Sequence, residues 1–65
     1  MTLSEYTKKV MKNLMANSLV LSPILTDQLV KKNEGLIAEN WEFGEPVENT
    51  ATMLWLQYKK EKKGI

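Results

Sequence analysis

The residues best suited to acid–base or metal chemistry are five closely spaced glutamates: Glu34, Glu39, Glu42, Glu45 and Glu48. Paired carboxylates act as acid and base when a desolvated pocket separates their pKa values, and these glutamates lie in a segment that we expect to be largely loop. Glu39, Glu42 and Glu45 have the chemistry to hold a hard cation, but the Asp-rich calcium-loop pattern is absent.

The nucleophiles and bases of common enzymes are also scarce in this chain. It has no histidine and no cysteine, so the usual thiol nucleophile and imidazole base are both missing. No glycine-rich phosphate loop occurs. We therefore expect a protein that is not an enzyme and that has no cofactor, no metal site and no small-molecule substrate.

The second chemical feature is a lysine run near the C-terminal end: Lys59, Lys60, Lys62 and Lys63. Lysines in the last turns of a helix offset the helix dipole and aid solubility. They can also contact phosphates without reading sequence. Every basic residue of the chain is lysine, which disfavours specific base readout, because arginine makes the bidentate contacts to guanine. Nucleic acid is thus a possible partner through these four lysines.

Charge is divided unevenly along the chain although the net charge is only +1. Residues 34–48 carry only acidic charges, whereas both flanking segments are basic. Such a division predicts an oriented electrostatic field, either within the molecule or across a dimer.

The third feature is a group of large apolar residues that a core does not easily absorb: Trp41, Phe43, Met53 and Leu56. Trp41 and Phe43 either pin a loop onto the core or form an acidic, aromatic contact surface. Met53 and Leu56 lie off the face formed by Ala51, Leu54 and Trp55, which makes that helix apolar nearly all round. We interpret the four residues as a protein-interaction surface and expect self-association.

The elements that carry these residues have clear start signals. Thr2 and Glu5 form a capping box before an apolar stripe, which predicts a helix over 3–17. Ser22 and Pro23 are typical of a second start, and this helix should run to about Lys32.

The remaining boundaries are less distinct. The Asn33–Gly35 segment indicates a break, with Gly35 supplying the cap, followed by a short helix from Gly35 to Asn40 or Trp41; one kinked helix is the alternative. Residues 42–48 read as a loop. Asn49 then caps a last helix, and Gly64 suits its C-terminal cap.

The chain therefore predicts an all-α fold, a small compact domain of three to four helices spanning residues 1–65. The expected core is Tyr6, Val10, Leu14, Leu21, Leu25, Leu29, Leu36, Ile37, Leu54, Trp55 and Tyr58, with Ile24 or Val30 as a further candidate. No membrane-spanning or targeting segment is visible, so we expect a cytoplasmic protein.

The leading functional hypothesis is a small regulatory or adaptor protein that acts by protein–protein interaction, similar in kind to phage or plasmid accessory factors and inhibitors. The alternative is a small DNA-associated protein that uses its C-terminal lysines.

Overall fold

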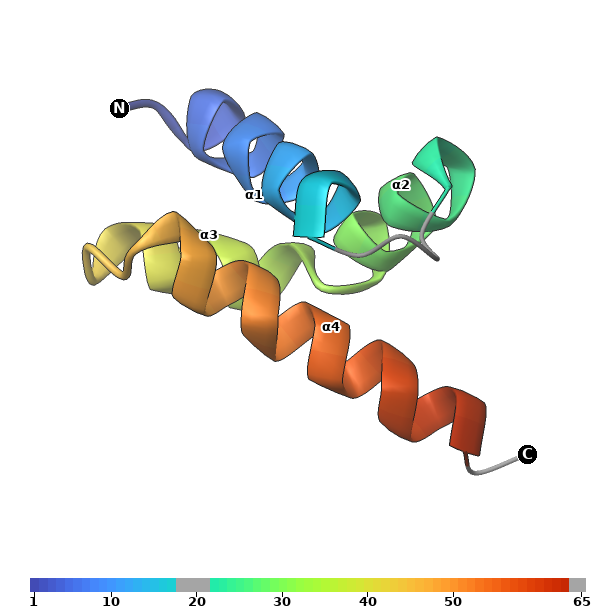
Figure 1. The fold of residues 1–65 in the computed structure, drawn as a ribbon. Helices are drawn as coiled ribbons and strands as arrows, with labels where there is room; N and C mark the ends of the chain where they lie inside the picture. The colour runs from blue at the N-terminus through green and yellow to red at the C-terminus, as the bar shows by residue number, and fades with distance from the viewer. Residues whose placement is uncertain (18–21, 64–65) are drawn as a thin grey trace.

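The structure is a computed structural model that describes residues 1–17 and 22–63, without the side chains of residues 17, 62 and 63. Over these ranges the backbone forms four helices and no strand: α1 (Leu3–Asn17), α2 (Pro23–Lys32), α3 (Glu34–Glu42) and α4 (Val47–Lys63) (Figure 1). The predicted all-α fold is confirmed, and α2 and α3 are separate helices. The Leu21 and Gly64 predictions lie outside the described residues.

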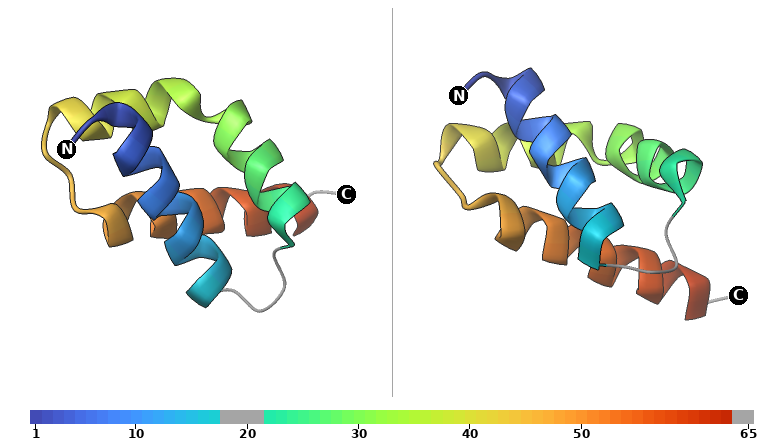
Figure 2. Two further views of the ribbon diagram at one scale, coloured as in Figure 1. Left: turned by 90° about the horizontal axis from the view of Figure 1, so that it is seen from above. Right: turned by 45° about the horizontal axis from the view of Figure 1, so that its top comes forward.

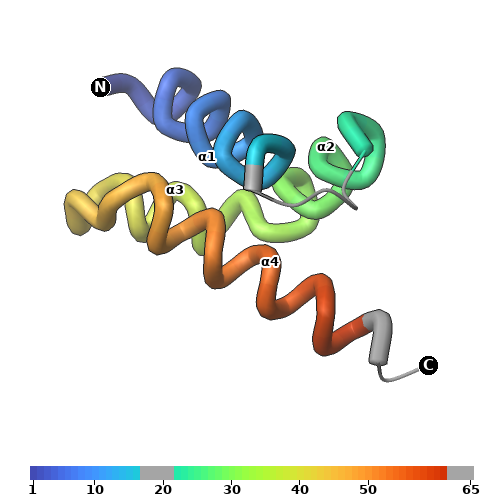
Figure 3. Tube along the Cα trace, in the orientation of Figure 1, coloured from blue at the N-terminus to red at the C-terminus, as the bar shows by residue number. Residues whose placement is uncertain are grey.

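Helix α1 is the central packing element. It contacts each of the other three helices, and its contact with α4 is the most extensive helix pair. Seen from above, α1 crosses over α4, and the N-terminus lies near the connection between α3 and α4 (Figure 2). The chain reverses direction at that connection, so that α4 runs back past α3 (Figure 3).

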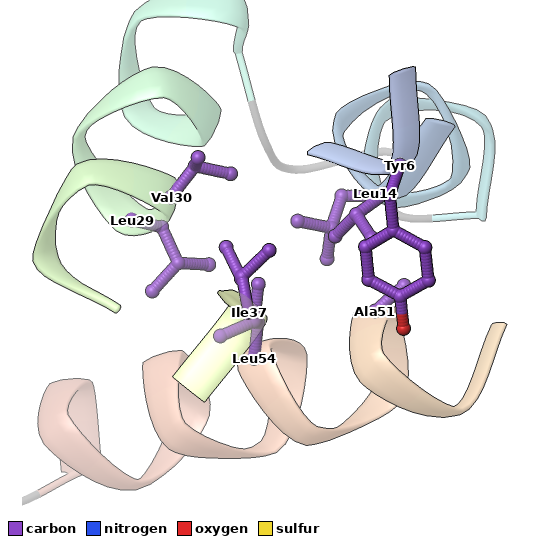
Figure 4. Close-up of a cluster of buried hydrophobic side chains, with 8 residues drawn as sticks. Tyr6, Leu14, Leu29, Val30, Ile37, Ala51 and Leu54 are labelled. Atoms are coloured by element: carbon purple, nitrogen blue, oxygen red, sulfur yellow. The ribbon is translucent and has the colours of Figure 1, made fainter. Parts of the chain in front are cut away.

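The core takes side chains from all four helices (Figure 4). Its buried apolar members are Tyr6, Val10, Leu14, Leu29, Val30, Ile37, Ala51 and Leu54. Leu36, Trp55 and Tyr58 are half-buried against this cluster. Nearly all of the predicted core in the described ranges is therefore correct.

Leu25 is the predicted core residue that the structure contradicts, because it is 37% exposed. The inward face of α2 is formed by Thr26, Leu29 and Val30, and Leu25 precedes Thr26 by one residue, about 100° around the helix. Thr26 tolerates burial because its hydroxyl donates to the Ser22 carbonyl at 2.9 Å. Ile24 is 71% exposed, so Val30 is the residue that joins the core.

The first two helices begin as predicted. The backbone N–H of Glu5 donates to Thr2 Oγ1 at 3.1 Å, and the backbone N–H of Thr2 donates to Glu5 Oε1 at 3.0 Å. Ser22 caps α2 by accepting from the Leu25 N–H, with Pro23 in the first turn. Both caps satisfy N–H groups that helix geometry leaves free.

The break between α2 and α3 differs in detail from the prediction. It falls on Asn33 alone, whose side-chain amide donates to the Leu29 carbonyl at 2.8 Å. Gly35 is helical and caps nothing. The left-handed glycine is Gly44, at φ 73° after α3.

Gly44 ends α3 in a Schellman motif. Its N–H donates to the Trp41 carbonyl, and the Glu45 N–H donates to the Asn40 carbonyl at 2.9 Å. These are the two bonds that define the motif. The connection to α4 is short as a result, and α4 begins at Val47, earlier than predicted.

The predicted cap at Asn49 is therefore wrong. The Asn49 N–H donates to the Pro46 carbonyl at 3.1 Å, which places Asn49 inside the first turn. Its side-chain amide donates to Glu45 Oε1 at 2.9 Å instead of capping the backbone.

Candidate interaction surfaces

The two aromatic residues at the end of α3 have different environments. Trp41 is half-buried against the core, and its indole N–H donates to the Met1 carbonyl at 2.9 Å. Phe43 follows as the C-cap residue of α3 and is 79% exposed. Trp41 thus holds the N-terminal segment in place, while Phe43 presents its ring to solvent.

A buried chain of hydrogen bonds lies beside this turn. Tyr6 Oη donates to the Glu45 carbonyl at 2.8 Å and lies 2.6 Å from Thr50 Oγ1. Asn40 Nδ2 donates to the same Thr50 oxygen at 3.0 Å. Because Tyr6 has one O–H, already used on Glu45, the Thr50 hydroxyl donates to Tyr6. These hydrogen bonds link α1, α3 and the α3–α4 connection to α4.

The outer face of α4 carries two exposed apolar side chains. Met53 is 41% exposed and Leu56 is 56% exposed, whereas Leu54 between them is fully buried. Residues three apart on a helix are surface neighbours, so Met53 and Leu56 form one apolar patch. Asn40 Nδ2 lies 3.5 Å from Met53 Sδ, which positions Met53 toward α3.

The lysines of α4 differ in their surroundings. Lys59 Nζ lies 5.9 Å from the centroid of the Trp55 ring, in cation–π geometry. The Trp55 and Tyr58 rings stack with centroids 5.7 Å apart. Lys60 is exposed and has no ion pair within the described residues. Lys62 and Lys63 belong to α4, but their side chains lie outside the described set.

A second basic surface lies on α1. Lys8, Lys9 and Lys12 line a shallow depression of about 230 Å³ together with Glu5. The hydrogen bonds that the Glu5 carboxylate accepts from Thr2 lower the pKa of Glu5, and nearby Lys9 lowers it further. The carboxylate therefore stays ionised and offsets part of the lysine charge.

Two further hollows border the N-terminal segment. A groove of about 440 Å³ runs between α1, α2 and α3, with Leu3, Val30 and Ile37 among its lining residues. Another, of about 380 Å³, lies between Tyr6, Trp41 and Val47.

The glutamate cluster does not assemble into a ligand set. Among the residues whose positions are described, no three acidic side chains are grouped so that they could hold a metal ion. Likewise, no helix in these ranges has the length and apolarity needed to cross a membrane.

Comparison with protein-family models, with curated proteins and with solved structures finds no match for this chain.

Proposed function

We propose that this chain is a small, non-enzymatic regulatory or adaptor protein that acts by protein–protein contact through the outer face of α4. The observation that carries the proposal is the apolar pair Met53 and Leu56, exposed midway along a helix whose opposite face supplies Ala51 and Leu54 to the core. Exposed apolar side chains grouped together are typical of interaction sites.

Phe43 extends the proposed surface toward the α3–α4 connection. Its ring is the most exposed of the large apolar side chains in the described residues, and aromatic side chains are enriched among residues that dominate binding. Trp41 belongs to this proposal as a support, because its indole holds the Met1 carbonyl and its ring packs against the core.

The test is partner capture by immobilised protein from the native host, with bound proteins identified by mass spectrometry. We expect Leu56→Glu to abolish capture, since a charge in the centre of the surface must be desolvated on binding. The matched control is Ile24→Glu, which makes the same change at a 71% exposed position on α2. The surface is wrong if both variants capture the partner equally.

The alternative function, phosphate contact by the C-terminal lysines, is favoured by one observation. Lys59 and Lys60 are exposed and form no ion pair with a described carboxylate. A mobility-shift assay at about 50 mM salt tests it, since nonspecific phosphate binding is strongest at low salt. Binding that is lost with Lys59→Gln/Lys60→Gln would support this function over protein contact.

A further inference from the structure

The outer face of α4 carries a regular strip of side chains, which we call the α4 strip: Asn49, Met53, Leu56 and Lys60. They recur at intervals of four, three and four residues, the spacing of a coiled-coil seam. All four side chains are exposed, so the seam is open to a second helix. Its apolar content is confined to the two central positions.

Opposite charges lie at the two ends of the α4 strip: the Glu45 carboxylate beside Asn49, and Lys60 itself. At the first end, the Asn49 side-chain amide donates a hydrogen bond to Glu45 Oε1 at 2.9 Å. At the other end, Lys60 has no ion pair within the described residues. With Glu45 included, the order along the face is therefore acidic and polar at Glu45 and Asn49, apolar at Met53 and Leu56, and basic at Lys60.

We infer that the partner that fits this order is a second copy of the chain, with the two α4 helices antiparallel. A two-fold axis between Met53 and Leu56 places each Met53 against the partner's Leu56. The same axis sets each Lys60 against the partner's Asn49 and Glu45. A two-fold contact requires such a self-complementary surface.

The charges also select the direction of pairing. In a parallel pair, each Lys60 faces the partner's Lys60 and each Glu45 faces the partner's Glu45. Like charges in close contact oppose association. The order of charges along the α4 strip therefore favours the antiparallel pair.

The dimer is weak, because a contact along one face of α4 falls well short of the roughly 800 Å² per partner that stable complexes bury. We expect a dissociation constant on the order of 100 µM or weaker. The inference rests on the proposed function in that both use Met53 and Leu56. A heterologous partner would compete with the second copy for the same residues.

The experiment is sedimentation equilibrium up to about 1 mM protein in low salt. Wild type should dimerise, and Lys60→Glu and Glu45→Lys should each weaken the dimer about tenfold, because two ion pairs become two repulsions. An equimolar mixture of these two variants should form heterodimers, and the double variant Glu45→Lys/Lys60→Glu should dimerise like wild type. Lys12→Glu, with the same charge change on α1, is the control and should leave the dimer intact.

Cross-linking provides an independent measurement of the pairing, since the chain has no cysteine of its own. A mixture of Met53→Cys and Leu56→Cys proteins should form a disulfide-linked heterodimer faster than either protein forms a homodimer. Equal rates would overturn the antiparallel register.

The dimer and the proposed function can fail separately. Wild type that remains monomeric at 1 mM overturns the dimer, while capture of a partner that depends on Leu56 would still stand. If the charge variants change dimerisation as expected but no captured partner depends on Leu56, the dimer stands and the adaptor function is rejected.

Discussion

Removal of one hydroxyl group from the buried hydrogen-bond chain should destabilise the whole fold. Tyr6 is 4% exposed and Thr50 is fully buried, and their oxygens lie 2.6 Å apart. Tyr6→Phe keeps the ring in the core but deletes the Oη. The Thr50 hydroxyl then loses its acceptor, and the Glu45 carbonyl loses the donor at 2.8 Å.

The expected cost of Tyr6→Phe is about 2 kcal/mol in the free energy of unfolding. Each buried hydrogen bond contributes a net stabilisation of roughly 0.5–1.5 kcal/mol, and an unsatisfied buried group adds to the loss. Total stability for a chain of this size is roughly 3–10 kcal/mol, so the loss is a large share. Thr50→Val should cost about 1 kcal/mol, because Tyr6 can still donate to Glu45.

Urea unfolding followed by helical circular dichroism measures both costs. The double variant Tyr6→Phe/Thr50→Val should lose about 1 kcal/mol less than the sum of the single variants, since the bond between them is counted twice. Thr52→Val, at an exposed position of α4, serves as the control and should change stability by less than about 0.5 kcal/mol. Full additivity, or a Tyr6→Phe protein as stable as wild type, would refute the hydrogen-bond chain.

Four further substitutions test two glycines of α3 and its end, the cap of α1 and the N-terminal segment. Gly44→Ala should cost about 1 kcal/mol in urea unfolding, because φ is 73° there, whereas Gly35→Ala should stabilise by about 0.5 kcal/mol, since Gly35 is helical with open space around it. The folded-state pKa of Glu5 lies below its ordinary value of 4.5, so its stabilisation is present above about pH 4.5 and is lost as pH falls through the folded pKa. Glu5→Gln should therefore flatten the acid limb of a stability–pH curve. Trp41→Phe should cost about 1 kcal/mol by removing the donor to the Met1 carbonyl, measured by thermal unfolding.

The first two helices could be predicted from sequence because their start signals are local. Thr2 and Glu5 form hydrogen bonds with each other three residues apart. Ser22 caps the start of α2, and Pro23 follows it in the first turn. These interactions depend on residues within one turn. Both helices consequently have the bounds that the sequence predicts.

The later boundaries depend on contacts that short-range patterns do not contain. Asn49 has the chemistry of a cap, but its amide bonds Glu45 because the Gly44 turn brings that carboxylate close. Gly35 and Gly44 both have the chemistry of a helix end. Only Gly44 lies where the chain reverses direction. This reversal is what allows α4 to pack against α1, so the position of the turn depends on a contact between helices far apart in the sequence.

The candidate surfaces were predictable only in part. The spacing of Met53 and Leu56 relative to Leu54 follows from about 100° per residue, so their outward direction could be read from the sequence. Trp41 and Phe43 could not be told apart, because the difference depends on the Met1 carbonyl, which is 40 residues from Trp41. The burial of Thr50 depends likewise on Tyr6, 44 residues away.

The apolar patch of Met53 and Leu56 on α4 does not contribute to the core. Leu56 lies about 200° around the helix from Leu54, so turning α4 to bury Leu56 would expose Leu54, which is fully buried, and would break the bond between Thr50 and Tyr6. The hydrogen-bond chain therefore fixes which face of α4 points inward. Met53 and Leu56 stay outside in every arrangement that keeps these hydrogen bonds. Covering their apolar surface with a partner is favourable, because it removes that surface from water. A variant that breaks the chain, such as Tyr6→Phe, should consequently weaken partner binding as well as stability, because it loosens the orientation of the binding face.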